Sequence, residues 1–117
     1  MLSFSSRQKY YLYTQPTDMR KQFDGLSGLV RQHFKQEVMS GDAFLFVNRK
    51  CDRIKILMWD VTGFALYYKR LESGTFEMPQ ATGEENSIEL NWPDLVFMLE
   101  GIELCSIKRR KRYRQRA

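Results

Sequence analysis

Short runs of aromatic and β-branched residues, separated by turn residues, predict that much of this chain forms a sheet. The runs cover residues 10–14, 44–49, 53–59 and 64–71. Turn-like residues separate the last three runs, so we expect a three-stranded antiparallel meander. The last run also fits a helical period through Phe64, Tyr67, Tyr68 and Leu71. The Gly63 turn before it favours a strand.

The middle run has the alternation that is typical of a strand with two different faces. Ile54, Ile56 and Met58 alternate with Arg53, Lys55 and Leu57. This period of two predicts one buried face. Residues 87–90 form a further short extended segment, and residues 75–78 are predicted to continue the sheet before Pro79.

Apolar residues at spacings of three and four predict a first helix between the first two runs. They form one stripe: Met19, Phe23, Leu26, Val30 and Phe34. We expect this helix to begin at Thr17 or Asp24, whose side-chain oxygens suit an N-cap, and to extend to about Glu37, before Gly41.

A second helix is predicted after Asn91, which is a good N-cap with Asp94 at the third helical position. Residues 95–99 are continuously apolar, so this helix is expected to be largely buried. Gly101 is the expected C-cap. The predicted fold is a single α+β domain over residues 1–107, an antiparallel meander packed with two main helices, followed by a basic tail over residues 108–117.

The charge of the chain is unevenly distributed, although its net value is only +5 over 117 residues. Residues 1–70 carry 12 Lys and Arg against 6 Asp and Glu. Residues 71–107 carry 8 acidic residues with no Lys or Arg, and the last ten residues carry 7 basic ones. A basic tail of this kind often binds nucleic acid, but it also fits a solubilising segment or one that folds back onto the acidic stretch.

Several classes of protein are disfavoured by the sequence. No apolar run reaches the roughly 18 residues of a membrane span, and the first residues contain no apolar signal segment. Cys51 and Cys105 do not form a disulfide framework, so we expect a cytoplasmic protein. His33 is the single histidine, and Asp52 and Asp60 flank the middle strand at opposite ends, too far apart to share a metal. We therefore expect no enzyme, no metal site and no cofactor.

Basic residues gather where the two predicted hairpins meet, and we call this set the basic hairpin end. It comprises Arg49, Lys50, Arg53, Lys55, Lys69 and Arg70. Like charges placed this close lower the stability of the fold unless an anion or an acidic side chain neutralises them. Two interpretations remain open with equal weight: a surface that contacts DNA phosphates, or pairing with the acidic residues 71–107.

The tail adds seven candidate phosphate contacts. They are Lys108, Arg109, Arg110, Lys111, Arg112, Arg114 and Arg116. If all seven engaged duplex DNA, the affinity would fall steeply with salt, by a log–log slope of about −0.9 per phosphate.

Several motifs together resemble one known family, the TnpB-type accessory proteins of bacterial insertion sequences of the "sixty-six" group, the products of the second open reading frame. The opening motif is Pro16-Thr17-Asp18-Met19-Arg20-Lys21 followed by Asp24-Gly25-Leu26. The central motif is Asp52–Leu57, Trp59-Asp60, Gly63-Phe64 and Tyr68–Glu72, continued by Gly74, Phe76 and Pro79. Leu99–Ile102 is similar to the C-terminal helix end. Met58, Met78 and Gly28 depart from the pattern.

The resemblance implies an accessory role in transposition, a form of DNA recombination, beside a separate catalytic transposase in a bacterial cytoplasm. It supplies no catalytic residues. We therefore expect a non-catalytic protein that contacts DNA, the transposase, or both. Arg20 and Lys21 are further candidates for the phosphate surface. The alternative is an adaptor that docks on the transposase through acidic residues 71–107 without binding DNA.

Overall fold

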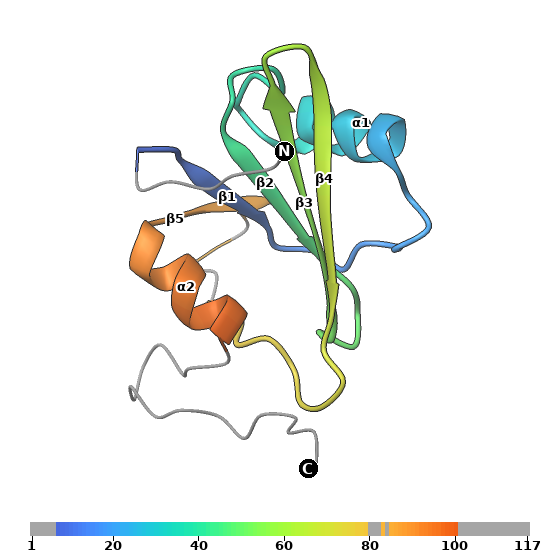
Figure 1. The fold of residues 1–117 in the computed structure, drawn as a ribbon, viewed down its shortest axis with the longest axis vertical. Coiled ribbons are helices and arrows are strands. Elements are labelled where there is room, and N and C mark those ends of the chain that lie inside the picture. Colours follow the sequence, from blue (N-terminus) through green and yellow to red (C-terminus); the bar gives the residue numbers. More distant parts are fainter. Residues whose placement is uncertain (1–6, 80–82, 84, 101–117) are drawn as a thin grey trace.

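The computed structural model describes residues 7–79, 83 and 85–100. Its elements in chain order are β1 (Tyr10–Tyr13), α1 (Phe23–His33), β2 (Ala43–Val47), β3 (Arg53–Asp60), β4 (Gly63–Arg70), β5 (Ser87–Leu90) and α2 (Trp92–Glu100). Strands and two helices share one compact domain, which confirms the predicted α+β class (Figure 1).

The sheet has five strands in the order β4-β3-β2-β1-β5. β2, β3 and β4 pair antiparallel in sequence, which confirms the meander and the assignment of residues 63–70 to a strand. β1 pairs parallel with β2 and antiparallel with β5, so the complete sheet is mixed. Parallel neighbours need a crossover connection, which α1 provides between β1 and β2.

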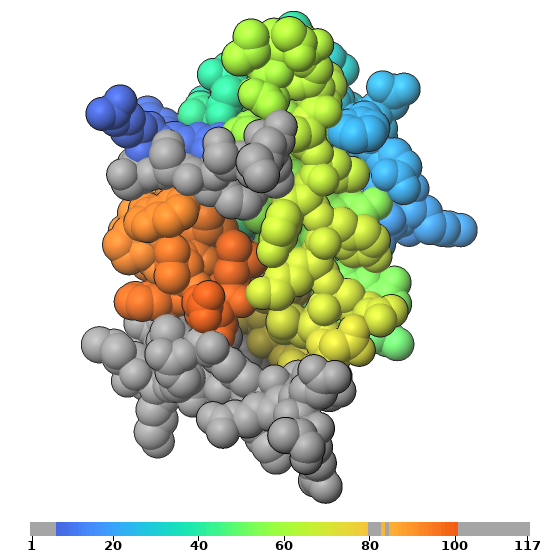
Figure 2. All heavy atoms as spheres, in the orientation of Figure 1, coloured from blue at the N-terminus to red at the C-terminus, as the bar shows by residue number. Residues whose placement is uncertain are grey.

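The two helices cover opposite faces of the sheet (Figure 1). Leu26, Val30 and Phe34 pack onto one face, where Phe34 meets Phe44 edge-to-face at 5.2 Å between ring centroids. On the other face Leu95 and Met98 of α2 pack onto residues of β1, β2, β3 and β5. In Figure 2, α2 lies beside the segment that follows β4, and Leu71, Met78 and Leu99 border the same core.

Because helices lie on both faces, the prediction that β3 has one buried face is wrong. Ile54 and Ile56 belong to the core beneath α2, while Leu57 belongs to the core beneath α1. Lys55 and Leu57, expected on an exposed face, are 1% and 0% exposed. The alternation within one strand does not show whether a helix covers the second face of the sheet. Here α1 covers that face, on which Lys55 and Leu57 are buried.

The predicted boundaries of the first helix are also wrong. Its N-cap is Gln22, without a side-chain cap hydrogen bond, instead of Thr17 or Asp24. Asp18 organises a separate turn before the helix, in which it accepts hydrogen bonds from the Arg20 N–H at 2.9 Å and, through its carbonyl, from the Lys21 N–H at 3.1 Å. At the other end Phe34 is already extended, so the helix ends at His33.

The C-terminal elements follow the sequence prediction in part. Residues 75–78 form no strand, although Phe76 is buried and its N–H donates to the Cys51 carbonyl at 2.7 Å. Residues 87–90 do form a strand, and Asn91 does cap α2, since its Oδ1 accepts from the Asp94 N–H at 2.8 Å. The predicted cap at Gly101 lies outside the described residues.

Candidate nucleic-acid interface

The turn between β2 and β3 is built around the side chain of Asn48. Its Oδ1 accepts hydrogen bonds from the backbone N–H groups of Asp52 and Arg53, each at 3.0 Å, and its Nδ2 donates to Asp52 Oδ1 at 2.7 Å. Cys51 takes a left-handed conformation in this turn, with φ of 59°. The turn therefore presents Arg49 and Lys50 as exposed side chains on a fixed backbone.

Arg53 connects this turn to the β3–β4 hairpin. The sequence predicted that it lies near Lys69 and Arg70, and the antiparallel register places it directly opposite Arg70, so both side chains lie on the α1 face. Arg53 lines a shallow cavity of about 360 Å³ with Arg49 and Lys50, and a second of about 320 Å³ with Tyr68 and Arg70. The two cavities meet at Arg53.

We call Arg49, Lys50, Arg53 and Arg70 the basic face. It retains four of the six residues of the basic hairpin end, and the structure places the other two elsewhere. Lys69 is opposite Ile54, on the face that α2 covers, and its Nζ donates to the Leu99 carbonyl at 3.3 Å. Period-two alternation between Lys69 and Arg70 explains their separation.

Lys55 is the second residue of the basic hairpin end that lies outside the basic face, because it is fully buried. Its Nζ donates to the carbonyl oxygens of Met19 at 2.7 Å and Lys21 at 2.8 Å. The same ammonium lies 4.8 Å from the centroid of the Tyr68 ring. The expectation of a solvent-facing Lys55 is wrong. Its position fastens the turn before α1 to the centre of the sheet.

An acidic residue does reach the basic face. Arg70 and Glu72 form an ion pair at 2.9 Å, and the hydrogen bond from this guanidinium to Glu72 raises the pKa of Arg70. Both side chains are more than half exposed. Exposed ion pairs contribute about 0–1 kcal/mol, so this one is weak enough for a phosphate to compete with Glu72.

Arg20 and Lys21 are exposed in the turn that Lys55 holds. The Arg20 guanidinium contacts Asp18 at 2.7 Å, and its hydrogen bonds lower the pKa of Asp18 to about 2. Asp18 also lines the cavity shared by Arg49, Lys50 and Arg53. Arg20 is therefore engaged by a neighbouring carboxylate at the border of the basic face.

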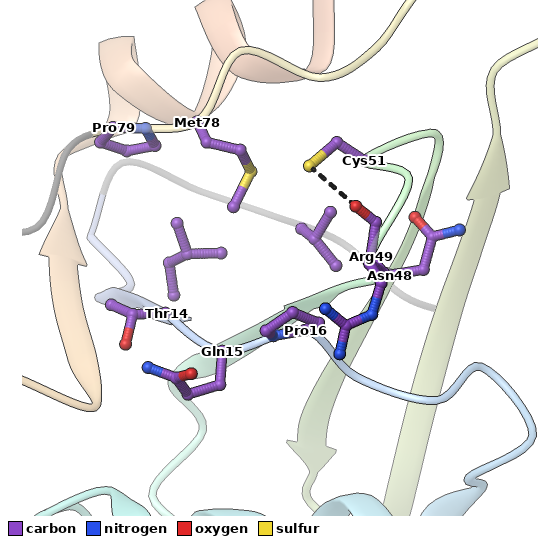
Figure 3. Close-up of a pocket in the computed structure, with 10 residues that line it drawn as sticks. Thr14, Gln15, Pro16, Asn48, Arg49, Cys51, Met78 and Pro79 are labelled. Carbon is purple, nitrogen blue, oxygen red and sulfur yellow. Dashed lines mark hydrogen bonds between the residues drawn. The ribbon is translucent and has the colours of Figure 1, made fainter.

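A third cavity, of about 200 Å³, lies behind the same turn (Figure 3). Leu12, Pro16, Val47 and Met78 give it an apolar lining, with Thr14 and Gln15 at its rim. Arg49 extends beside Pro16, while Cys51 Sγ donates to the Arg49 carbonyl at 3.9 Å. This contact uses only the carbonyl of Arg49, whose side chain also borders the cavity.

Four residues of the central motif, Trp59, Asp60, Gly63 and Phe64, lie at the opposite end of the β3–β4 hairpin. Trp59 and Phe64 pack edge-to-face at 5.0 Å between centroids, and Asp60 pairs with Gly63 at the turn. Val61 is 84% exposed in this turn with φ of 52°, a left-handed conformation that is rare for a β-branched residue. These residues are far from the basic face along the strands.

His33 has an aromatic neighbour: its ring stacks on Tyr13 at 5.4 Å between centroids. Within the described ranges, no group of three His, Cys, Asp or Glu residues is arranged to hold a metal ion. In the same part of the chain, no helix has the length and apolar character needed to cross a membrane. The seven basic residues of the tail lie outside the described residues.

Comparison with known proteins identifies relatives over nearly the whole chain. A family model described as "IS66 Orf2 like protein" matches residues 8–109. The uncharacterized protein y4jC of Sinorhizobium fredii (strain NBRC 101917 / NGR234) is 29% identical over 110 residues, which cover 94% of this chain and 92% of the relative. The uncharacterized protein y4hO of the same strain is 31% identical over 103 residues, 88% of each chain. No solved structure is significantly similar to this chain.

Proposed function

Because this chain belongs to the IS66 Orf2-like family, an accessory family of insertion sequences, we propose that it assists transposition by holding the DNA backbone on its basic face. The observation that carries the proposal is the meeting of Arg49, Lys50, Arg53 and Arg70 around two adjoining cavities. Arg53 and Arg70 are directly opposite like charges, an arrangement that costs stability; the weak ion pair with Glu72 offsets part of this cost at Arg70, and a bound phosphate would offset more of it.

The tail extends this surface in the proposal. Lys108–Arg116 supply seven further positive charges, which would add phosphate contacts without sequence preference. Arg49, Lys50 and Arg70 of the basic face are exposed on a turn and a strand, and neither helix of the described residues carries a member of this face. We therefore propose backbone binding with weak sequence selectivity, and the transposase of the same element as the second partner.

A fluorescence-anisotropy titration with element-end DNA at about 50 and 200 mM salt tests the proposal. Replacing Arg49, Lys50 and Arg53 by Ala is expected to weaken binding and to reduce the log–log salt slope by about 1 per lost contact. Arg31→Ala, which removes an exposed charge from α1, is the matched control and should leave the slope unchanged. Failure of the wild-type protein to bind at low salt, with or without transposase, would refute DNA contact.

Truncation after residue 107 separates the two parts of the surface. If the tail is a phosphate-binding arm, its removal lowers the salt slope by up to about 6. An unchanged slope would assign the tail to solubility and leave the basic face as the binding surface.

A second candidate function is docking on a basic surface of the transposase. It is favoured by a cavity of about 470 Å³ between α1 and β5, where Glu85 and Glu89 lie near His33 and Lys35. A transposase pull-down that survives nuclease treatment and is lost on reversal of Glu84 and Glu85 to Lys would support docking through the acidic residues 71–107. Retained capture by the reversed variant would count against it.

A further inference from the structure

The exposed aromatic ring of Tyr68 lies within the basic face. Tyr68 is 49% exposed on β4, two residues before Arg70 on the same side of the strand. Arg53 Nη1 lies 3.5 Å from the Tyr68 hydroxyl. The ring, the two guanidinium groups and Glu72 line one cavity of about 320 Å³. An aromatic surface thus lies between two candidate phosphate contacts.

The buried ammonium of Lys55 fixes the position of the Tyr68 ring. Lys55 Nζ lies 4.8 Å from the ring centroid, and its hydrogen bonds to the Met19 and Lys21 carbonyls hold the ammonium in place. A cation against one face of an aromatic ring is attractive by about 0.5–2 kcal/mol. One face of Tyr68 is therefore occupied by a buried cation, and the exposed fraction leaves the other available to a ligand.

The combination of phosphate contacts and a fixed ring favours one form of DNA. Arginine contacts to phosphates hold single and double strands alike, whereas an aromatic ring on a strand stacks with a base only where that base is unpaired. Bases inside a duplex are stacked on each other and present only their edges in the grooves. We propose that this cavity binds single-stranded DNA, with phosphates on Arg53 and Arg70 and one unpaired base on Tyr68. The proposal rests on the DNA-binding function proposed above and specifies its substrate.

Glu72 competes with a bound phosphate for Arg70 in this site. It pairs with Arg70 at 2.9 Å in the free protein, so a phosphate that binds Arg70 must compete with it. Glu72→Gln removes this competition and is therefore expected to tighten single-strand binding several-fold. A purely structural Glu72–Arg70 pair would give no such gain.

Anisotropy titrations of a fluorescein-labelled oligothymidine and of a duplex of the same length test the proposal on the full chain. Tyr68→Ala should weaken single-strand binding by about 5- to 150-fold, the range expected for one lost stacking contact, and change duplex binding less than twofold. Tyr68→Phe should retain the affinity, because it retains the ring. Phe23→Ala, which removes an exposed aromatic residue from α1, is the control and should bind as the wild type does.

Two further measurements separate stacking from folding. Tyr68→Leu keeps an apolar cover over Lys55 but loses the aromatic face and its contact with the ammonium, so it should melt below the wild-type temperature, remain folded at the assay temperature and still lose single-strand affinity. Photo-crosslinking with a bromodeoxyuridine oligonucleotide, followed by peptide mapping, should attach the base to Tyr68. Crosslinks only at other residues would overturn the proposal.

The outcomes distinguish the two proposals. If the wild-type protein binds neither form of DNA, the proposed function fails and this site fails with it. If it binds DNA and Tyr68→Ala weakens both forms equally or neither, the basic face stands and the single-strand site is refuted. Tighter binding of the duplex than of the single strand also refutes it.

Discussion

Replacing the buried Lys55 by Met should destabilise the protein while leaving its volume nearly unchanged. The ammonium makes two hydrogen bonds, at 2.7 and 2.8 Å, to the Met19 and Lys21 carbonyls. Hydrogen bonds with a charged partner contribute about 1.5–3 kcal/mol each, and the contact with Tyr68 adds about 0.5–2 kcal/mol. Burying the ammonium is unfavourable, and Met avoids that penalty. We therefore expect a net loss of about 2–3 kcal/mol in the free energy of unfolding.

Urea denaturation followed by tryptophan fluorescence measures this loss, with Lys50→Met as the matched control at an exposed position. The control should change the free energy of unfolding by less than about 0.5 kcal/mol. Hydrogen exchange gives a local check, because backbone amides of residues 17–21 should exchange faster in Lys55→Met than in the control. A Lys55→Met variant that is as stable as the wild type would show that the ammonium does not hold this turn.

Three more changes test other parts of the structure. Val61→Gly should raise the free energy of unfolding by about 0.5–1 kcal/mol, since glycine adopts the left-handed φ of 52° without strain; a loss in urea denaturation would contradict this. The Asp18 carboxyl should titrate at about 2 by NMR, and Arg20→Ala should return its pKa toward 3.8. Because the folded pKa is lowered, the stability that Asp18 contributes is present above about pH 4 and is lost as pH falls toward 2; an unchanged midpoint in the variant would refute the pairing. Asn48→Ala removes three hydrogen bonds from the β2–β3 turn and should cost about 2–3 kcal/mol, whereas a loss below 0.5 kcal/mol would show that the backbone alone specifies the turn.

The sequence predicted the local elements better than the way they pack. The meander and the Asn91 cap depend on nearby residues, and both are confirmed. The insertion of β1 between β2 and β5 depends on pairings between distant segments, which no local pattern encodes. The same limit explains the error at the start of α1: residues 18–21 form a turn that Lys55 of β3 fastens, so the helix begins after Gln22 instead of at Thr17 or Asp24.

The sequence likewise predicted only part of the candidate site. Hairpin geometry placed Arg53 and Lys55 near Lys69 and Arg70 without fixing the register, and the structure places Arg53 directly opposite Arg70. The prediction grouped Lys69 with Arg70, although the alternation of a strand places these adjacent residues on opposite faces of the sheet. Lys55 was misplaced for a related reason: a lysine in an alternating strand is usually exposed, and here a turn supplies two carbonyl acceptors in the interior.

The buried lysine also explains how two distant signature motifs form one surface. Residues 16–21 are joined to the end of the sheet by the hydrogen bond from the Thr17 N–H to the Val47 carbonyl at 2.9 Å, and by the bonds from Lys55. The surface that these motifs form with the β2–β3 turn therefore contains two kinds of residue with different consequences when changed. Lys55 and Asn48 hold the scaffold, so their loss should lower stability and DNA binding together. Arg49, Lys50 and Arg70 are exposed on that scaffold, so their loss should lower DNA binding at unchanged stability.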